Sequence, residues 1–300
     1  MTGTREPSIV DTQRWRYYTL APALAIYLLL AVLPVANLLA MSVHDIKWVD
    51  GLAQWAFAGP KHFHELPRDP LFRAGLANTA LFAVLAVGAE MVIGFCLALF
   101  VSRIRTGRVV YRTIFLLPIL LPGIVIGAIW KLMYNPDFGV VNQLLAILGV
   151  PAIDWLGERS LALLSVVVVD VWHWTPFVFL LLLAGLESLP QDLYEAAKVD
   201  GASAWAELRY LTIPMMLPTL AVTMAFRLIV SFKVFDEVYL LTGGGPGTAT
   251  EVVSFTIYRR FFTEDRMGYG SAISVVVLFT LTLVIVLCLA AARRRASEAA

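Results

Sequence analysis

Long apolar runs separated by polar segments dominate the chain. A helix needs about 20 mostly apolar residues to cross the roughly 30 Å of hydrocarbon in a bilayer. Runs of that length occur at 17–43, 76–101, 109–133, 161–186, 213–239 and 270–292. We therefore predict an all-α membrane protein with six transmembrane helices, an N-terminal tail at 1–16 and a C-terminal tail at 293–300.

Composition agrees with this prediction, because 59% of the 300 residues are hydrophobic and only 15% are charged. Neither an ordinary soluble domain nor a disordered chain has that balance. The net charge of +1 leaves no electrostatic footprint for nucleic acid. Cys96 and Cys288 stand far apart in apolar runs, which favours two buried thiols over a disulfide.

Arginine-rich segments indicate the orientation, since short loops rich in Lys and Arg stay in the cytoplasm. They follow the second run and end the chain, at Arg103, Arg105, Arg108, Arg112 and 293–295. Six spans then place both termini and the 189–211 loop in the cytoplasm, with 44–75, 134–160 and 240–269 outside. Arg14 and Arg16 resemble the start of a signal peptide, but the run after them is too long and has no clean cleavage site, so we expect it to be retained as an uncleaved first span.

A charged segment at 189–218 interrupts the apolar pattern. Asp192 and Glu195 have the spacing of a helix cap and its third-position carboxylate, which predicts a short helix starting at Leu193. Asp200-Gly201 then predicts a break, and a second helical turn follows through Trp205. On spacing alone, Glu195 merely caps a helix and Gly201 merely permits a positive φ.

This segment closely resembles the EAA motif of ABC importer permeases. The matching residues are Glu195, Ala196, Ala197, Gly201 and the closing 211–214, where leucine and isoleucine are exchanged before the proline. The resemblance implies the type I importer permease fold, with a coupling helix that fits a groove of a separate ATP-hydrolysing subunit. Glu195, Ala196, Ala197, Asp200 and Gly201 would form that docking surface.

Further segments are similar to the carbohydrate-importing branch, the maltose F and glycerol-phosphate A type of permease. They are Asn78-Thr79, FLLPILLP at 115–122, 135–142 and SFKVFDEVYLLTGGGPG at 231–247. This resemblance implies a heterodimer with a second permease, two ATPase subunits and an external substrate-binding protein. It implies no cofactor on this chain, with ATP and Mg used by the ATPase; accordingly, the glycine run at 243–248 lacks the lysine of a phosphate-binding loop.

Ionisable residues inside the runs point to a pathway, because each costs about 2.5–3.5 kcal/mol on insertion scales. They are Glu90, Asp170, Arg227 and Lys233. Helical spacing puts Asp170, His173, Trp174 and Phe177 on one stripe, where aromatic faces and polar groups suit a sugar ring. Alternatively, Trp174 packs between helices and His173 makes an interhelical hydrogen bond. We expect Arg227 and Lys233 to pair with Asp236 or Glu237.

No catalytic set and no metal site is predicted, since HExxH and G-x-S-x-G are absent and the histidines are not grouped with cysteines. We therefore expect a non-catalytic permease subunit that moves a sugar or related polyhydroxylated solute by alternating access. An ion-coupled secondary transporter relaying ions through Asp170 and Glu90 is the main alternative, and a membrane-embedded enzyme is another. Which solute is moved, and which permease holds most of its contacts, stays open.

Overall fold

The computed structural model describes residues 9–104 and 107–298, apart from the side chains at 9–17, 108, 288–289 and 291–298. The strands are β1 His44–Val49 and β2 Leu52–Phe57. The helices are α1 Ile9–Ser42, α2 Lys61–Glu65, α3 Pro70–Arg103, α4 Arg108–Leu116, α5 Gly123–Met133, α6 Val140–Ile147, α7 Ala162–Glu187, α8 Gln191–Val199, α9 Ala204–Ala206, α10 Ile213–Ser231, α11 Asp236–Leu241, α12 Val253–Tyr258 and α13 Met267–Glu298. Tighter or wider turns occur at η1 Leu66–Arg68, η2 Pro118–Leu120, η3 Glu207–Thr212 and η4 Arg259–Thr263.

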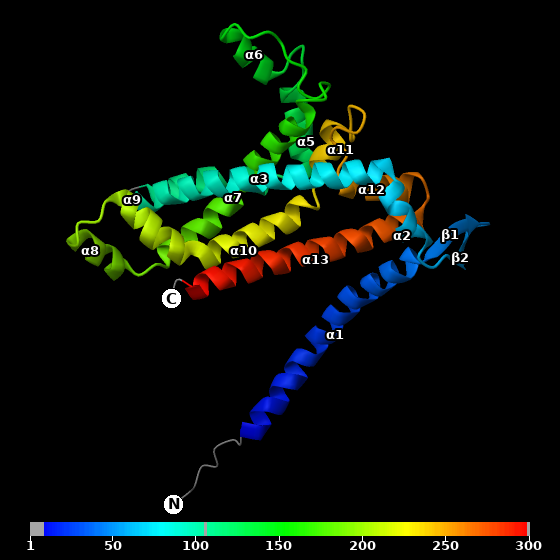
Figure 1. The fold of residues 1–300 in the computed structure, drawn as a ribbon, viewed down its shortest axis with the longest axis horizontal. Coiled ribbons are helices and arrows are strands. Elements are labelled where there is room, and N and C mark those ends of the chain that lie inside the picture. Colours follow the sequence, from blue (N-terminus) through cyan, green and yellow to red (C-terminus); the bar gives the residue numbers. More distant parts are fainter. Residues whose placement is uncertain (1–8, 105–106, 299–300) are drawn as a thin grey trace, which may run out of the picture.

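Four long helices, α3, α7, α10 and α13, lie side by side (Figure 1). At one end of this bundle are α8, α9 and the C-terminal end of α13, and at the other are α2, α12 and the β1–β2 hairpin (Figure 1). Helix α1 runs diagonally away from the bundle and meets it mainly along α13 (Figure 1). The segment of α5 and α6 projects from the opposite side (Figure 1).

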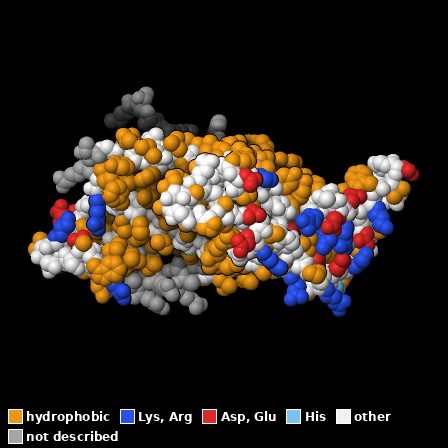
Figure 2. Space-filling view, turned by 90° about the horizontal axis from the view of Figure 1, so that it is seen from above, with side chains coloured by type: hydrophobic (Ala, Val, Ile, Leu, Met, Phe, Trp, Pro, Cys, Tyr) orange, Lys and Arg blue, Asp and Glu red, His pale blue; other side chains and the backbone are white. Residues whose placement is uncertain are grey.

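The surface has the polarity of a membrane protein. Figure 2 shows apolar side chains along the middle of the bundle and charged side chains gathered at both ends, with a smaller charged group over the middle. Within the described residues, five helices are long and apolar enough to span a membrane, at Tyr18–Ser42, Pro70–Arg103, Ala162–Glu187, Ala204–Ser231 and Met267–Leu287. Gly123–Met133 is a shorter apolar helix. The count of six spans therefore stays a prediction.

The predicted span at 109–133 is not one helix, which corrects the expectation. Helix α4 ends at Leu116, η2 starts at Pro118, and α5 starts only after Pro122. Proline removes a backbone donor and disfavours helical backbone in the residue before it. Two prolines four positions apart, Pro118 and Pro122, therefore stop a continuous helix here. The apolar run therefore continues as three shorter pieces, α4, η2 and α5.

The predicted span at 213–239 also ends early, because α10 stops at Ser231 and α11 begins at Asp236. A break in a helix leaves backbone groups that need partners. Here the Val234 carbonyl accepts a hydrogen bond from the Ser254 hydroxyl. A contact with a distant segment therefore stabilises a break that the local sequence does not signal.

The expectation of an all-α chain is wrong at one place, the antiparallel hairpin of β1 and β2. Val49 pairs with Leu52, so only Asp50 and Gly51 form the turn. Both have positive φ, at 51° and 78°, which a two-residue hairpin turn requires. The Asp-Gly pair was the sequence signal for this hairpin.

Close packing of α3 on α7 forms the centre of the core. A Cβ added at Gly94 would lie 2.7 Å from Cγ1 of Val178, so only glycine permits this approach. Apolar side chains from both helices, including Ala98 and Phe179, pack there with Met216 of α10. The core therefore joins the spans on either side of α8.

Polar ties hold the connections at the α2–α12 end, and they use residues of the branch-specific segments. The Asn78 amide donates to the carbonyls of Thr248 (2.8 Å) and Glu251 (2.9 Å). The Thr79 hydroxyl accepts from the Val253 amide (2.9 Å). The Asn78-Thr79 pair on α3 therefore fixes the glycine-rich connection before α12.

Some sequence expectations fall outside the described part or need correction. The first eight residues of the N-terminal tail, Arg105, and the side chains of Arg108, Cys288 and 293–295 lie outside the described residues. Cys96 is exposed on α3, so the expectation of a buried thiol is wrong there. A long apolar helix has more apolar surface than its own bundle covers, and Cys96 lies on the part of α3 that the isolated chain leaves uncovered.

Candidate functional site

Helix α8 lies between α7 and α10, within the segment that carries the EAA motif. Its N-cap is Pro190, with extended backbone and no side-chain cap, so the prediction that Asp192 caps a helix starting at Leu193 is wrong. Proline fixes its own φ and cannot continue a preceding helix, which separates α8 from α7 and starts it directly at Gln191.

The end of α8 matches the predicted break at Asp200-Gly201. Gly201 has φ +78°, and its amide donates to the Lys198 carbonyl (3.1 Å). The next amide, of Ala202, donates to the Ala197 carbonyl (2.9 Å). This pair of bonds is a Schellman motif, which satisfies the last carbonyls of a helix and favours glycine at the left-handed position.

Four of the five predicted docking residues are exposed. Glu195, Ala196, Asp200 and Gly201 are exposed, while Ala197 is half-buried. No residue of α8 is buried. The helix is nevertheless held in place on its inner side, where the hydroxyls of Tyr194 and Thr212 lie 3.0 Å apart. The outer face is therefore a free surface on an anchored helix.

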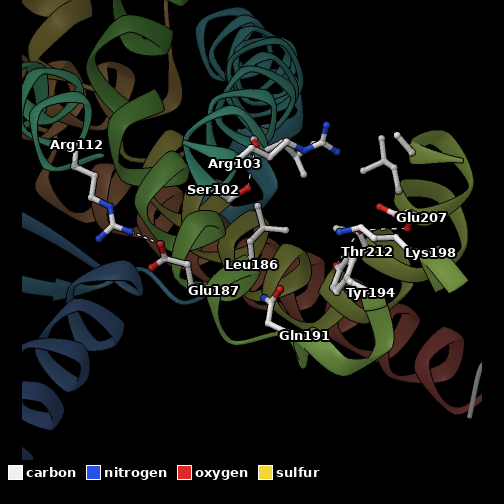
Figure 3. Close-up of a pocket in the computed structure, with 13 residues that line it drawn as sticks. Ser102, Arg103, Arg112, Leu186, Glu187, Gln191, Tyr194, Lys198, Glu207 and Thr212 are labelled. Atoms are coloured by element: carbon white, nitrogen blue, oxygen red, sulfur yellow. Dashed lines mark hydrogen bonds and ion pairs between the residues drawn. The ribbon is translucent and has the colours of Figure 1, made fainter. Parts of the chain in front are cut away.

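A cavity of about 750 Å³ lies behind α8. The ends of α3 and α7, helix α8 and η3 contribute to its walls (Figure 3). On one side Arg112 of α4 pairs with Glu187 at the end of α7, and on the other are Tyr194, Lys198 and Glu207 (Figure 3). At this end of the bundle an ion pair therefore joins α4 to the end of α7, and the hydroxyl contact between Tyr194 and Thr212 joins α8 to η3.

Three buried charges form a second candidate site, where α3, α7 and α10 meet. The Arg227 guanidinium donates to both carboxylate oxygens of Glu90, through Nε to Oε2 and through Nη2 to Oε1 (2.6 Å). Nη2 also donates to Oδ2 of Asp170 (2.9 Å). The side chains of these residues are at most 3% exposed. A bidentate pair with a third charged partner is the arrangement that offsets the cost of burying charge.

The expected pairing of Arg227 and Lys233 with Asp236 or Glu237 is wrong. Arg227 pairs with residues 137 and 57 positions earlier in the chain. Glu237 instead accepts a hydrogen bond from Nδ1 of His173 (3.2 Å). Lys233 is exposed and forms no ion pair with another described residue. The backbone break after Ser231 explains this, because it ends the helical spacing on which the pairing relied.

The predicted stripe on α7 does converge around Arg227. The guanidinium lies over the Trp174 ring, 4.6 Å from its centroid. Trp174 contacts Phe177 edge-on at 6.0 Å, and Phe177 packs on Phe226 of α10 at 4.8 Å. The charged members are buried, whereas Phe226 is 41% exposed. Sequence spacing finds the α7 stripe but not Phe226, which is one exposed aromatic residue among many.

An ionic network joins elements at the opposite end. Arg260 donates to Asp69, the N-cap of α3, at 2.8 Å, and the Tyr269 hydroxyl donates to the same carboxylate at 2.8 Å. Burial raises the pKa of Asp69, but the hydrogen bonds from Tyr269 and the Leu71 amide, with Arg260, hold it below its ordinary value on balance. Ionised Asp69 therefore ties α3 to η4 and α13.

Residues 90–296 match the family model described as the binding-protein-dependent transport system inner membrane component. The chain is 38% identical over 272 residues to the trehalose/maltose transport system permease protein MalF of Thermococcus litoralis, covering 90% of this chain and 89% of that protein. It is 34% identical to the trehalose transport system permease protein SugA of Mycobacterium tuberculosis, covering 91% of this chain and 87% of that protein.

The fold is also similar to a solved structure, a chain of a bacterial ABC transporter involved in the import of the acidic polysaccharide alginate. The TM-score is 0.81 at 25% identity, covering 95% of this chain and 97% of that chain. Relatives in this family are permease subunits, so ATP hydrolysis belongs to a separate subunit, and an ion-coupled secondary transporter is not favoured. The chain belongs to the binding-protein-dependent inner membrane components and is a permease subunit of an ABC importer.

Proposed function

We propose that this permease carries a sugar or related polyhydroxylated solute into a bacterial cell by alternating access, and that α8 couples it to the ATPase. The relatives named for trehalose and maltose support this class of solute. One observation carries the coupling: α8 is exposed along its outer face while its ends continue into α7 and α10. A push on α8 therefore acts directly on two spans that meet in the core.

The orientation in this proposal puts α8 and both termini in the cytoplasm, where ATP is available. The end of the bundle with α2, α12 and the hairpin then faces outward and receives the external binding protein. The opposite end carries Arg103 and Arg112, as the positive-inside rule requires. ATP and Mg are bound by the ATPase subunits, with one such subunit under each permease of a heterodimer.

Helix α1 supports the presence of a second permease. Its most apolar window, within Tyr18–Ser42, has no buried residue in the isolated chain. Large side chains such as Leu24 and Tyr27 are 58% and 68% exposed. A span that leaves its own bundle in this way has a long face free for a neighbouring subunit.

The solute path in this proposal follows α7 and α10. Trp174 and Phe177 of α7 lie at its surface, the buried Asp170, His173 and Arg227 lie beside these rings, and Lys233 is near its outer end. Aromatic faces cover the apolar C–H faces of a sugar, and the polar groups next to the rings hold those rings in place.

Charge reversal on α8 tests the coupling. We expect Glu195→Lys to weaken co-purification of the ATPase and to abolish ATPase stimulation by the binding protein, because the outer face of α8 makes that contact. Glu158→Lys is the matched control, an exposed glutamate in the connection between α6 and α7. Unchanged ATPase binding and stimulation in the Glu195 variant would refute the assignment.

A further inference from the structure

The Glu90–Arg227–Asp170 cluster has no accessible charge to offer a solute. The side chains of Arg227 and Glu90 are 0% exposed, and that of Asp170 is 3% exposed. Every N–H of the guanidinium except those on Nη1 has a carboxylate partner, and Nη1 is itself buried without a partner among the described residues. In this state the cluster acts inside the protein and not on its surface.

Arg227 makes contacts through the flat face of its guanidinium as well as through the N–H groups at its edge. Arg227 Cζ lies 4.6 Å from the centroid of the Trp174 ring, within the range of a cation–π contact. Glu90 grips Nε and Nη2 together, which fixes the plane of the guanidinium as a single hydrogen bond cannot. The plane of the guanidinium in turn limits how the indole can lie.

Accessible surface in this region is aromatic. Trp174 and Phe177 are half-buried, and Phe226 is 41% exposed. Arg227 Cζ lies 4.6 Å from the centroid of the Trp174 ring. The ring centroids of Trp174 and Phe177 are 6.0 Å apart, and those of Phe177 and Phe226 are 4.8 Å apart. Trp174, Phe177 and Phe226 therefore form a continuous row of aromatic rings. The row starts at the buried Arg227 and ends at the exposed ring of Phe226.

We propose that Glu90 is a positioning residue for solute passage: it clamps Arg227 over Trp174 and so fixes the indole as an aromatic platform, with Phe226 as its exposed end. This rests on the proposed function, in which α7 and α10 line the solute path. Glu90 acts through Arg227 and does not touch the solute. Asp170 takes the remaining side of the guanidinium and keeps it from turning away.

The direct test measures Trp174 without any solute. In the assembled importer, the difference between the fluorescence emission of the parent protein and of Trp174→Phe isolates Trp174. We expect Glu90→Gln to shift the maximum of this difference spectrum, because a neutral amide no longer fixes the guanidinium. Glu65→Gln is the control, since Glu65 pairs with Arg266 (2.6 Å) at the far end of the bundle. We expect Glu65→Gln to leave the Trp174 difference spectrum unchanged.

If the Glu90→Gln protein does not insert into the membrane, a second variant provides the test. Glu90→Asp keeps the charge but shortens the reach, and we expect a smaller shift in the same direction. An unchanged Trp174 spectrum in whichever variant folds overturns the proposal, because a purely structural Glu90 would alter stability and leave the indole of the folded protein as it was.

Uptake of trehalose and maltose into proteoliposomes gives the functional comparison. We expect Glu90→Gln to raise KM about twofold to thirtyfold, the range that corresponds to weakening or losing one cation–π contact. In the Trp174→Phe background the same change adds little, because both act through one ring. If the KM changes of Glu90→Gln and Trp174→Phe add up in the double variant, the proposal that Glu90 acts through Trp174 is contradicted. Absence of ATP-driven uptake by the parent importer contradicts the proposed function alone, and the spectrum still decides the role of Glu90.

Discussion

Gly201 offers the sharpest test of α8 as a mechanical element. Its φ of +78° lies in the left-handed region, and no atom lies within 4 Å of an added Cβ. A side chain there is therefore opposed by backbone strain and not by a clash. Left-handed backbone costs a non-glycine residue about 1–2 kcal/mol, and β-branched side chains fare worst. Gly201→Val should lower the population of the native end of α8 by about fivefold to thirtyfold.

Gly149 supplies a matched control. It has φ +77°, an added Cβ would meet no atom within 4 Å, and it closes α6 through the same pair of backbone bonds, Gly149 to Ala146 and Val150 to Leu145. Gly149→Val therefore carries the same strain at a place that the coupling account leaves uninvolved. Any general effect of the substitution on folding appears in both variants.

The assay is ATPase activity of the reconstituted importer with and without its binding protein, together with the amount of ATPase that co-purifies. We expect Gly201→Val to lose most of the stimulation while the permease still inserts, and Gly149→Val to keep it. Equal stimulation in the two variants, whether both normal or both lost, would refute the claim that the geometry at Gly201 transmits force.

Other substitutions test the core and the outer network. Gly94→Ala should lower the thermal midpoint in detergent, because its Cβ would lie 2.7 Å from Val178, whereas Gly88→Ala on the same helix meets nothing within 4 Å and should raise it slightly or leave it unchanged. Arg227→Ala should cost about 3–5 kcal/mol of stability by leaving two carboxylates buried without their partner, seen as loss of folded protein in size-exclusion chromatography. Asp69 has a lowered pKa, so its contribution is complete above the ordinary value of 3.8 and is lost as pH falls below it; Asp69→Asn should remove this acid-dependent part of the unfolding curve.

Local signals in the sequence were sufficient for the end of α8 but not for its beginning. Asp200-Gly201 predicts a break, and a positive φ is found there, because only the few residues around a glycine decide that geometry. The N-terminal prediction failed because Pro190 starts the helix before Asp192 can cap it. The Asp50-Gly51 turn was equally local, and its hairpin was missed although the signal was present.

The buried cluster shows where sequence reasoning reaches its limit. Charged residues inside apolar runs are visible at once, and the need for partners follows from the cost of burial. Which partners meet depends on how α3, α7 and α10 rotate against one another, and Arg227 and Glu90 are 137 positions apart. The predicted partners of Arg227 lay within one helical turn of Lys233, and the end of α10 at Ser231 removed that spacing.

Cysteine cross-linking tests the central claim, that the outer face of α8 contacts the ATPase, most directly. In a chain with Cys96 and Cys288 replaced by serine, one cysteine is placed at Glu195 and, in a second chain, at the exposed Ile147 of α6. The account predicts that a short thiol cross-linker joins position 195, and not position 147, to the ATPase in assembled importer. A cross-link from 147 with none from 195 would contradict it.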